Sequence, residues 1–219
     1  NPKNMLPADS EVRVSNDAVE KTFGLYEDMI VVGIANESGV LNEETLGKIK
    51  RITEEILRTP GVAARDVAGF TTIDNVTVEK GTLQVSPLMT EVPTDTRELE
   101  GLRKQLFENP MFVGRIISQD GKTAAIYAPL EKGANGKAIA DKIREIVRQE
   151  GGPESYYVAG DPVARDTFGA EMFKLMAIFA PLAGLVMFAV RYLMFGDLFL
   201  SVALMMDAMI AIVWSMGLL

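Results

Sequence analysis

The sequence contains no cysteine and no histidine. Without a thiolate or an imidazole, the chain lacks the commonest nucleophiles and general bases, and it lacks the usual ligands of protein zinc sites. We therefore expect no catalytic residue, no metal site and no cofactor.

Charge is almost missing from the C-terminal part of the chain. Beyond residue 171 the only basic residues are Lys174 and Arg191, and the only acidic residues are Asp197 and Asp207. The first 171 residues therefore carry the whole net charge of −8. This acidic balance argues against nucleic-acid binding, which needs clustered basic side chains. The pattern predicts an acidic soluble domain joined to a membrane segment.

Two apolar runs make up this membrane segment. Residues 173–195 would extend about 34 Å as a helix, enough to cross a hydrocarbon core of about 30 Å. Lys174 and Arg191 lie near its ends, where basic side chains reach the interface. Pro181 is costly inside a soluble helix but tolerated in a spanning helix. A second run at 198–219 follows at once, which disfavours the alternative of a buried core helix.

The preceding part alternates between strand and helix patterns. Asn42 and Asp95 are suitable N-caps for two of the helices, and Asp95 has the capping-box spacing to Glu98. The expected elements are strands at 27–35 and 154–160, one or two short strands within 62–81, helices at 42–58, 95–110 and 136–150, and a hairpin at 112–130 around Asp120-Gly121.

This order of elements predicts an α+β fold of the ferredoxin-like, split βαβ type. We expect the helices at 42–58 and 136–150 to lie on one face of an antiparallel sheet. The expected domains are residues 25–162 as this sandwich and 163–219 as transmembrane helices. Residues 1–24 have no apolar core of a signal peptide. We expect them to follow a first transmembrane helix that belongs to a longer protein.

Four stretches together resemble the RND superfamily of transporters, and most closely its MMPL-like exporter branch. They are "NMLPADSEVR", "FENPMFVGRIISQDGKTAAIYAPL", "AGDPVARDTF" and "LAGLVMFAVRYLMFGDLFLSVALMM". The resemblance covers nearly the whole chain through the order and spacing of these stretches. It implies an extracytoplasmic porter domain followed by the second transmembrane helix and the start of the third.

The resemblance also implies a function. Members of this family export hydrophobic or amphiphilic molecules, such as lipids and drugs, driven by the proton gradient. The implied partners are membrane lipids, a lipid or hydrophobic small-molecule substrate, the remaining transmembrane helices and a second porter domain, and a homo-oligomer is compatible with them. The implied location is the cytoplasmic (inner) membrane, multi-pass, with residues 1 to about 170 on the extracytoplasmic side. The alternative is a membrane-anchored sensor or scaffold, related to sterol-sensing or secretion-assisting proteins.

Where family members often have "FRS" after the second helix, this chain has Phe195-Gly196-Asp197. The basic residue is displaced to Arg191, so the positive-inside signal of this loop is weak. Orientation in the membrane therefore rests on the resemblance.

No pair of carboxylates points to an enzyme. The pairs Glu43/Glu44, Glu54/Glu55 and Asp95/Glu98 suit helix ends or solvent-facing positions better than the cleft that acid–base catalysis requires. Gly160, Asp161 and Pro162 lie between a strand and a helix, which favours a structural turn over chemistry.

Four side chains are candidates for a substrate path. Tyr156 and Tyr157 on the last strand would line a cleft, although one of the two is expected in the core. Met172 and Met176 supply flexible thioethers of the kind found on promiscuous apolar surfaces. The alternative for the methionines is ordinary lipid-facing packing.

Asp207 is the candidate polar residue within the membrane. It would lie about 15 Å along the second apolar helix from Asp197, near the middle of the hydrocarbon core. A carboxylate at that depth is a functional candidate by default. The alternatives are a cap on a helix that begins later and a structural hydrogen bond to a neighbouring helix. We expect Asp207 to face other helices.

Overall fold

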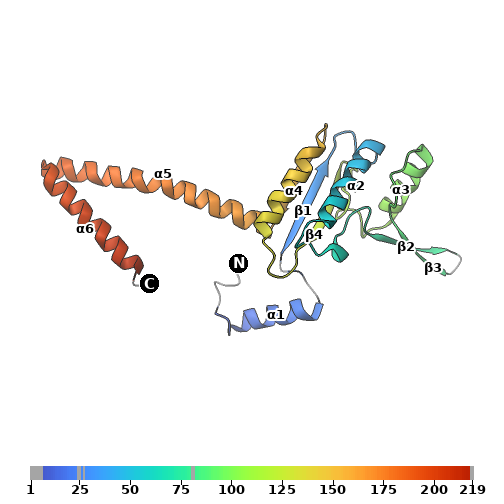
Figure 1. Cartoon of the computed structure of the whole chain (residues 1–219), viewed down its shortest axis with the longest axis horizontal. Coiled ribbons are helices and arrows are strands. Elements are labelled where there is room, and N and C mark those ends of the chain that lie inside the picture. Colours follow the sequence, from blue (N-terminus) through green and yellow to red (C-terminus); the bar gives the residue numbers. More distant parts are fainter. Residues whose placement is uncertain (1–6, 24–25, 27, 80–81, 218–219) are drawn as a thin grey trace. The chain divides into compact units, whose positions relative to one another are not determined.

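The computed structural model of the chain describes residues 7–23, 26, 28–79 and 82–217 and has a mixed α+β architecture (Figure 1). The chain divides into two compact units, residues 1–166 and 167–219. The elements are α1 (Glu11–Phe23), β1 (Met29–Ala35), α2 (Glu43–Leu57), the short 3-10 helix η2 (Ala64–Asp66), β2 (Asp74–Glu79), β3 (Thr82–Pro87), α3 (Thr96–Glu108), β4 (Thr123–Pro129), α4 (Gly136–Glu150), β5 (Ser155–Gly160), α5 (Asp161–Phe195) and α6 (Leu198–Gly217). The predictions for 1–24, 27–35, 62–81 and 198–219 each include residues outside the described ranges.

A three-stranded antiparallel sheet organises the first unit. Its strand order is β4–β1–β5, and both pairings of β1 are antiparallel. Beyond β4, Val62 and Ala68 form antiparallel bridges to Leu130 and Tyr127. Beyond β5, the described part of the chain supplies no further strand. One edge of the sheet is thus partly covered and the other is free.

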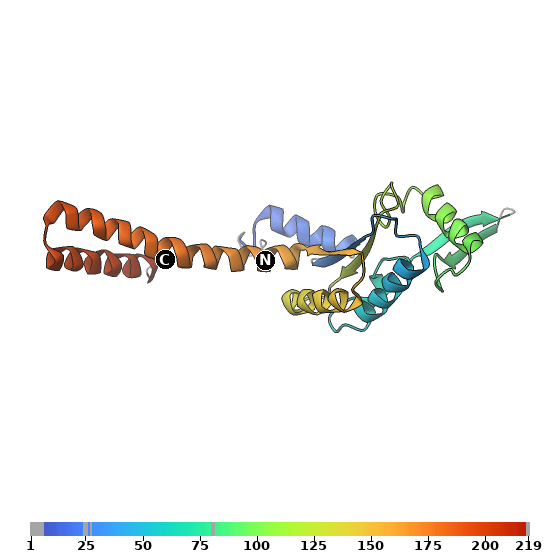
Figure 2. The same ribbon diagram turned by 90° about the horizontal axis from the view of Figure 1, so that it is seen from above.

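Helices α2 and α4 cover the same face of this sheet (Figures 1 and 2). Alternate residues of β1, namely Ile30, Val32 and Ile34, are fully buried, as the period of two requires for a strand covered on one face. The apolar stripes of α2 and α4 join them in one core, with contributions from Ile49, Ile52, Ile56, Ile139, Ile143 and Val147. The predicted placement of the two helices on one face is confirmed.

The helix starts follow from the capping residues. Asn42 accepts a hydrogen bond from the Thr45 backbone N–H, and Asp95 accepts one from Glu98, so both predicted N-caps are confirmed. The Glu98 carboxylate accepts a hydrogen bond from the backbone N–H of Thr94, and not from that of Asp95. These bonds satisfy N–H groups that the first turn of a helix leaves unpaired.

Two local predictions are confirmed only in part. The predicted turn at Asp120-Gly121 forms, with Gly121 at a φ of +71° and an antiparallel bridge between Ile117 and Ala124. Only β4 is a regular strand of the predicted hairpin at 112–130, and its ladder partner is β1. Of the one or two strands predicted within 62–81, β2 is present, whereas residues 62–70 contain η2 and isolated bridges. Strand β3 and helix α1 occur in segments for which neither was predicted.

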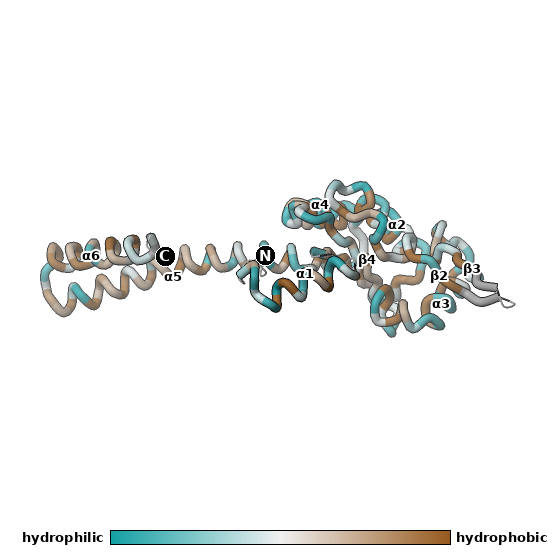
Figure 3. Tube along the Cα trace, turned by 90° about the horizontal axis from the view of Figure 1, so that it is seen from below, coloured by the Kyte–Doolittle hydropathy of each residue, from teal (hydrophilic) through white to brown (hydrophobic). Residues whose placement is uncertain are grey.

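The second unit consists of the remainder of α5 and of α6. Both helices are long and apolar enough to cross a membrane (Figure 3). Asp197 accepts hydrogen bonds from the backbone N–H groups of Phe199 and Leu200, so the predicted cap at the start of α6 is confirmed. A Cβ atom on Gly184 would lie 3.5 Å from the Met205 Cε atom, so α5 and α6 approach each other at this point.

Candidate functional site at the junction of β5 and α5

Strand β5 leads directly into α5, and it presents its two tyrosines to opposite faces of the sheet. The Tyr156 ring packs partly buried against the core, and its hydroxyl donates to the Gly151 carbonyl at 3.3 Å. The Tyr157 side chain is 62% exposed on the face that α2 and α4 do not cover. The structure therefore does not bring the two tyrosines onto one surface, and Tyr157 alone lies on the open face.

A buried polar network holds the residue just before β5. Glu154 lies between Lys48 Nζ, which donates to Oε2 at 2.7 Å, and Thr45 Oγ1, which donates to Oε1 at 2.8 Å. Asn36 donates in turn to Thr45 Oγ1 at 2.9 Å. The side chains of Lys48 and Glu154 are only 6% and 1% exposed. A buried charge persists where its partners satisfy it, and both partners of Glu154 are themselves buried. Lys48 has a second partner, the exposed Glu44, at 2.9 Å.

The electrostatics of this network favour the charged pair. Burial opposes ionisation of Glu154, but hydrogen bonds from Lys48 and Thr45 outweigh it, and the pKa of the carboxyl lies below its ordinary value. The hydrogen bond to Glu154, reinforced by one to Glu44, raises the pKa of Lys48 above its ordinary value. The network therefore stays ionised at neutral pH and ties α2 to the start of β5.

At the other end of β5, Gly160 approaches the backbone of β1 very closely. A Cβ atom on Gly160 would lie 2.1 Å from the Met29 carbonyl oxygen, and its φ of +134° is unfavourable for residues with a side chain. Only glycine fits this position, where the chain passes from the strand into the helix.

The first turn of α5 is docked on the domain. Pro162 and Val163 are buried, and Val163 belongs to the core of the domain. Pro162 suits the first turn of a helix, where its missing N–H is not needed. A Cβ atom on Gly136, the first residue of α4, would lie 2.6 Å from the Pro162 Cβ atom. Asp161, exposed at the helix start, carries the negative charge that the helix dipole favours there.

Two ion pairs flank this docked turn. Arg165 pairs with Asp28, the residue before β1, and Lys137 Nζ lies 2.6 Å from Asp166 Oδ1. The hydrogen bond to Asp166 raises the pKa of Lys137. Both pairs are partly solvated, so they orient the helix start more than they stabilise the fold.

These contacts pin β5 at both ends. We call residues Asp28, Gly136, Lys137 and 160–166 the β5–α5 junction. Glu154 anchors the start of the strand in the core, and the junction anchors its end and the start of α5. The arrangement suits the transmission of a displacement between α5 and the sheet. The carboxylates of Asp28 and Asp166 in the junction are both engaged in ion pairs.

The remaining predicted site residues lie in the second unit. Met172 and Met176 occupy successive turns of α5 and are 47% and 58% exposed. Asp207 is exposed in the middle of α6, and no hydrogen bond to it occurs within the described residues. Because α6 begins at Leu198, the alternative that Asp207 caps a later helix start is wrong.

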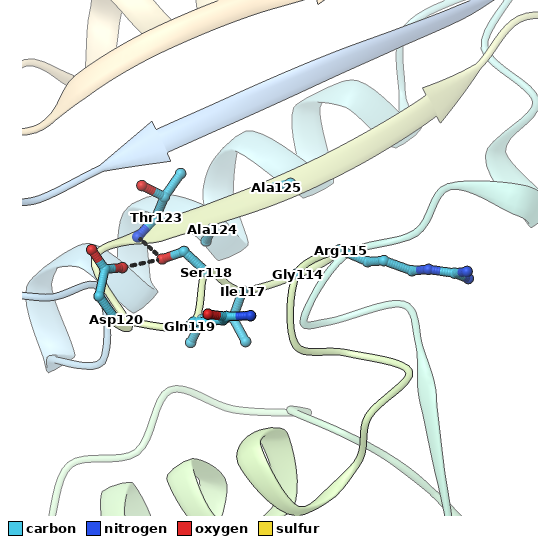
Figure 4. Close-up of a pocket in the computed structure, with 9 residues that line it drawn as sticks. All are labelled: Gly114, Arg115, Ile117, Ser118, Gln119, Asp120, Thr123, Ala124 and Ala125. Carbon is cyan, nitrogen blue, oxygen red and sulfur yellow. Dashed lines mark hydrogen bonds between the residues drawn. The ribbon is translucent and has the colours of Figure 1, made fainter.

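A pocket of about 570 Å³ lies beside the start of β4 (Figure 4). Ser118 Oγ donates to Asp120 Oδ1 at 2.5 Å and accepts from the Thr123 backbone N–H at 2.9 Å. The bond from Ser118 lowers the pKa of Asp120. Arg115 extends away from this pair. The polar groups are occupied in forming the turn, and the described residues contain no cluster of three or more metal-ligating side chains.

Sequence reasoning identified Gly160, Asp161 and Pro162 but missed their partners. Asp28, Gly136 and Lys137 come close to the helix start only through the fold, and no spacing along the chain indicates it. Lys48 did give a signal, because it lies on the apolar stripe of α2 between Thr45 and Ile52.

No protein-family model matches this sequence, and no curated protein matches it.

Proposed function

We propose that the chain is a segment of an RND-type transporter of the MMPL-like branch that exports hydrophobic or amphiphilic molecules. In this proposal residues 25–162 form a porter domain, and α5 and α6 are the second and third transmembrane helices. The β5–α5 junction is the observation that carries it. A transporter of this kind needs its membrane helices to act on the domain, and the docked first turn of α5 provides such a connection.

We further propose that the domain has ferredoxin-like topology. The antiparallel order β4–β1–β5 supports this, as do the crossovers through α2 and α4 on one face. In this proposal the segment with Val62 and Ala68, which makes isolated bridges to the outer edge of β4, corresponds to the fourth strand of the sheet. The short helix η2 between the two bridges would account for its irregularity.

In the proposed mechanism, tilting of α5 during the transport cycle displaces its first turn. Pro162 and Val163 carry the displacement into the core, and Arg165 carries it to the start of β1 through Asp28. Because Glu154 fixes the opposite end of β5, the strand moves together with the sheet. In this proposal, helices outside this sequence couple transport to protons. The protein is a multi-pass protein of the inner membrane, and its porter domain lies on the extracytoplasmic side.

One observation favours the alternative of a membrane-anchored sensor or scaffold. The open face of the sheet carries Tyr157 at 62% exposure, beside the half-exposed Val31 and Tyr127. Exposed aromatic and aliphatic side chains of this kind suit a protein partner. A sensor would bind its partner there and would move no substrate.

Transport measurements decide between the two functions. The protein with its remaining helices is reconstituted in vesicles, and export of a fluorescent amphiphile is followed with and without a pH gradient. Gradient-dependent export is expected, and its absence favours the sensor. Arg165→Gln, which breaks the pair with Asp28, should slow export several-fold at unchanged protein level.

Arg58→Gln is the matched control for that variant, since Arg58 forms an exposed pair with Glu55 away from the junction. It should transport normally. If Arg165→Gln also transports normally, the junction has no part in coupling.

Asp207 has its own test in the same assay. We propose that it faces helices that lie outside this sequence, which agrees with its exposed position on α6. Asp207→Asn should impair transport more than it lowers the protein level. Full transport by the Asn variant would remove Asp207 from the mechanism.

A further inference from the structure

The open face of the sheet, which α2 and α4 leave uncovered, carries no charge on the described strands β1, β4 and β5. Alternate residues of these strands point to it, and none of them is acidic or basic. Val31, Tyr127 and Tyr157 are its large side chains, and Tyr157 is 62% exposed. A sheet face that stays in water usually carries polar residues, so an uncharged face indicates a surface that something covers.

The middle of the open face consists of small residues. In the pairing register, Gly33 of β1 lies opposite Ala125 of β4 on one side and Tyr157 of β5 on the other. In the next row, Val31 lies between Tyr127 and Ala159. A glycine inside a strand often marks a place where another part of a protein approaches the sheet closely.

Helix α1 has an apolar stripe without a partner. Val12, Val19 and Phe23 recur at helical spacing on one side of the helix, and they are 70%, 47% and 72% exposed. Charged residues occupy the opposite side, Lys21 among them. The structure buries none of the residues of α1. Because a helix of 13 residues is marginal on its own in water, α1 gains stability from any surface that covers its stripe.

The connection to β1 keeps α1 near the open face. Five residues separate Phe23 from Met29, an ordinary length for the connection between a helix and the next strand. The Tyr26 hydroxyl within this connection donates a hydrogen bond to the Asp66 carboxylate, which fixes it to the domain. Phe23 lies three residues before Tyr26, at most about 11 Å from it. The end of α1 is therefore confined to the neighbourhood of the start of β1.

The dimensions of the helix and of the sheet agree. The 13 residues of α1 extend about 20 Å, and the 7 residues of β1 extend about 23 Å. When α1 turns back antiparallel to β1, Phe23 comes to lie over Val31. Val19, about 6 Å further along the helix, then comes to lie over Gly33, which is about 6.6 Å further along the strand.

We propose that α1 is a lid that closes on the open face by packing Val12, Val19 and Phe23 against the sheet. Closure covers Val31 and Tyr157, and opening exposes them. The lid thereby controls access to the surface that a sensor or scaffold would offer to a protein partner. It goes beyond the proposed transport function and does not depend on it, because it involves only α1 and the sheet.

Cross-linking tests the lid on the whole chain, which contains no native cysteine. Val19→Cys on the stripe is combined with Ala159→Cys on the open face, where Ala159 is exposed, and the purified chain is treated with a short bismaleimide. We expect a cross-link within one chain, identified by mass spectrometry of the joined peptides. Lys21→Cys with Ala159→Cys is the matched control, because Lys21 lies on the charged side of α1, and it should give several-fold less product.

The cross-linking yields can overturn the inference in three ways. Equal yields from the two cysteine pairs would mean that α1 makes no specific contact with the sheet. Absence of the product from both pairs would mean that α1 does not reach the open face. A product that joins two chains would assign this face to a second copy of the chain instead of α1.

The accessibility of a single thiol gives a second measurement that needs no cross-link. In the chain with Ala159→Cys alone, closure of the lid slows modification of the thiol by a bulky maleimide. Val19→Asp places a charge on the stripe and should accelerate the modification several-fold, whereas Lys21→Asp should leave its rate unchanged. Equal rates in all three chains overturn the inference. Neither measurement involves transport, so the lid and the proposed function fail separately.

Discussion

The two units of this chain treat charge and apolar surface in opposite ways. Residues 1–166 bury their aliphatic side chains in one core and satisfy the buried charges of Lys48 and Glu154 by each other. The described part of residues 167–219 exposes its large apolar side chains and gives a buried nitrogen of Arg191 no hydrogen-bond partner. The first unit thus contains groups that stabilise it. The second has the apolar surface of helices that could cross a membrane.

The largest expected effect comes from removing the partner of a buried charge in the first unit. In residues 1–166 alone, Lys48→Met leaves the Glu154 carboxylate buried beside Thr45 only. We expect a loss of about 3–5 kcal/mol in the free energy of unfolding, measured by urea denaturation at neutral pH. Lys104→Met is the control, because Lys104 lies in an exposed pair with Glu108, and it should change stability by less than about 1 kcal/mol. Equal effects of the two variants would show that the buried pair contributes nothing special.

The second test addresses the close approach of Gly160 to the backbone of β1. Gly160→Ala places a methyl group against the Met29 carbonyl and forces alanine into an unfavourable φ, so we expect a loss of about 3 kcal/mol. Gly101→Ala should have the opposite sign. Gly101 lies within α3 with open space around it, and alanine should stabilise the helix by about 1 kcal/mol. Thermal melting of both variants gives the comparison, and a neutral Gly160→Ala would contradict the close approach described here.

The third test asks where the self-sufficient unit ends. We expect a chain ending at Ala159 to remain soluble and to melt cooperatively. A chain ending at Asp166 also buries Val163 and retains both ion pairs of the junction, and it should be more stable by about 2 kcal/mol. Calorimetry of the two chains measures this difference. If both melt alike, the docked turn of α5 does not belong to the domain; if neither shows a transition, the domain depends on its membrane neighbours.

The smallest expected effect comes from pH. The pKa of Glu154 in the folded domain is below its ordinary value of 4.5, so its contribution to stability is present above that value and is lost as pH falls through the folded pKa. The pKa of Lys48 is raised above 10.5, so its contribution is present below that value and is lost only as pH rises through the folded pKa. Urea midpoints of residues 1–166 should therefore fall as pH drops below 4.5, and Glu154→Gln should weaken this dependence. If the urea midpoint of that variant depends on pH as strongly as that of the wild type, other carboxylates control the loss of stability in acid.

The regular helices of the domain could be predicted from the sequence because their local signals agree with their packing. In α2 the cap at Asn42, the acidic first turn and the apolar stripe all indicate one helix, and the structure places it at Glu43–Leu57. Helix α1 gave no such agreement, because the structure buries none of its residues. The predicted hairpin formed its turn and one antiparallel bridge but no second regular strand. The ladder partner of β4 is β1, which is distant in the sequence, and a local turn signal cannot reveal that partner.

The candidate site could be predicted only in part. The sequence around Gly160 indicates a turn, because glycine can adopt a positive φ and proline fixes φ near −65°. The contacts that make this turn a docking point come from Asp28 and Lys137, which the fold brings together from distant positions. Arg191 appeared in the sequence as a basic residue at a helix end, and only the structure shows that one of its nitrogens is buried.

The pair of Lys48 and Glu154 also restricts how this protein can change over generations. Replacing Lys48 alone leaves Glu154 as an unpaired buried charge, whereas replacing Glu154 alone leaves Lys48 with the exposed Glu44 as its remaining carboxylate partner. Replacing both with apolar residues of similar volume is often neutral or stabilising. We therefore expect a change at Lys48 to be tolerated better together with a change at Glu154, more than a hundred residues away in the sequence, than alone.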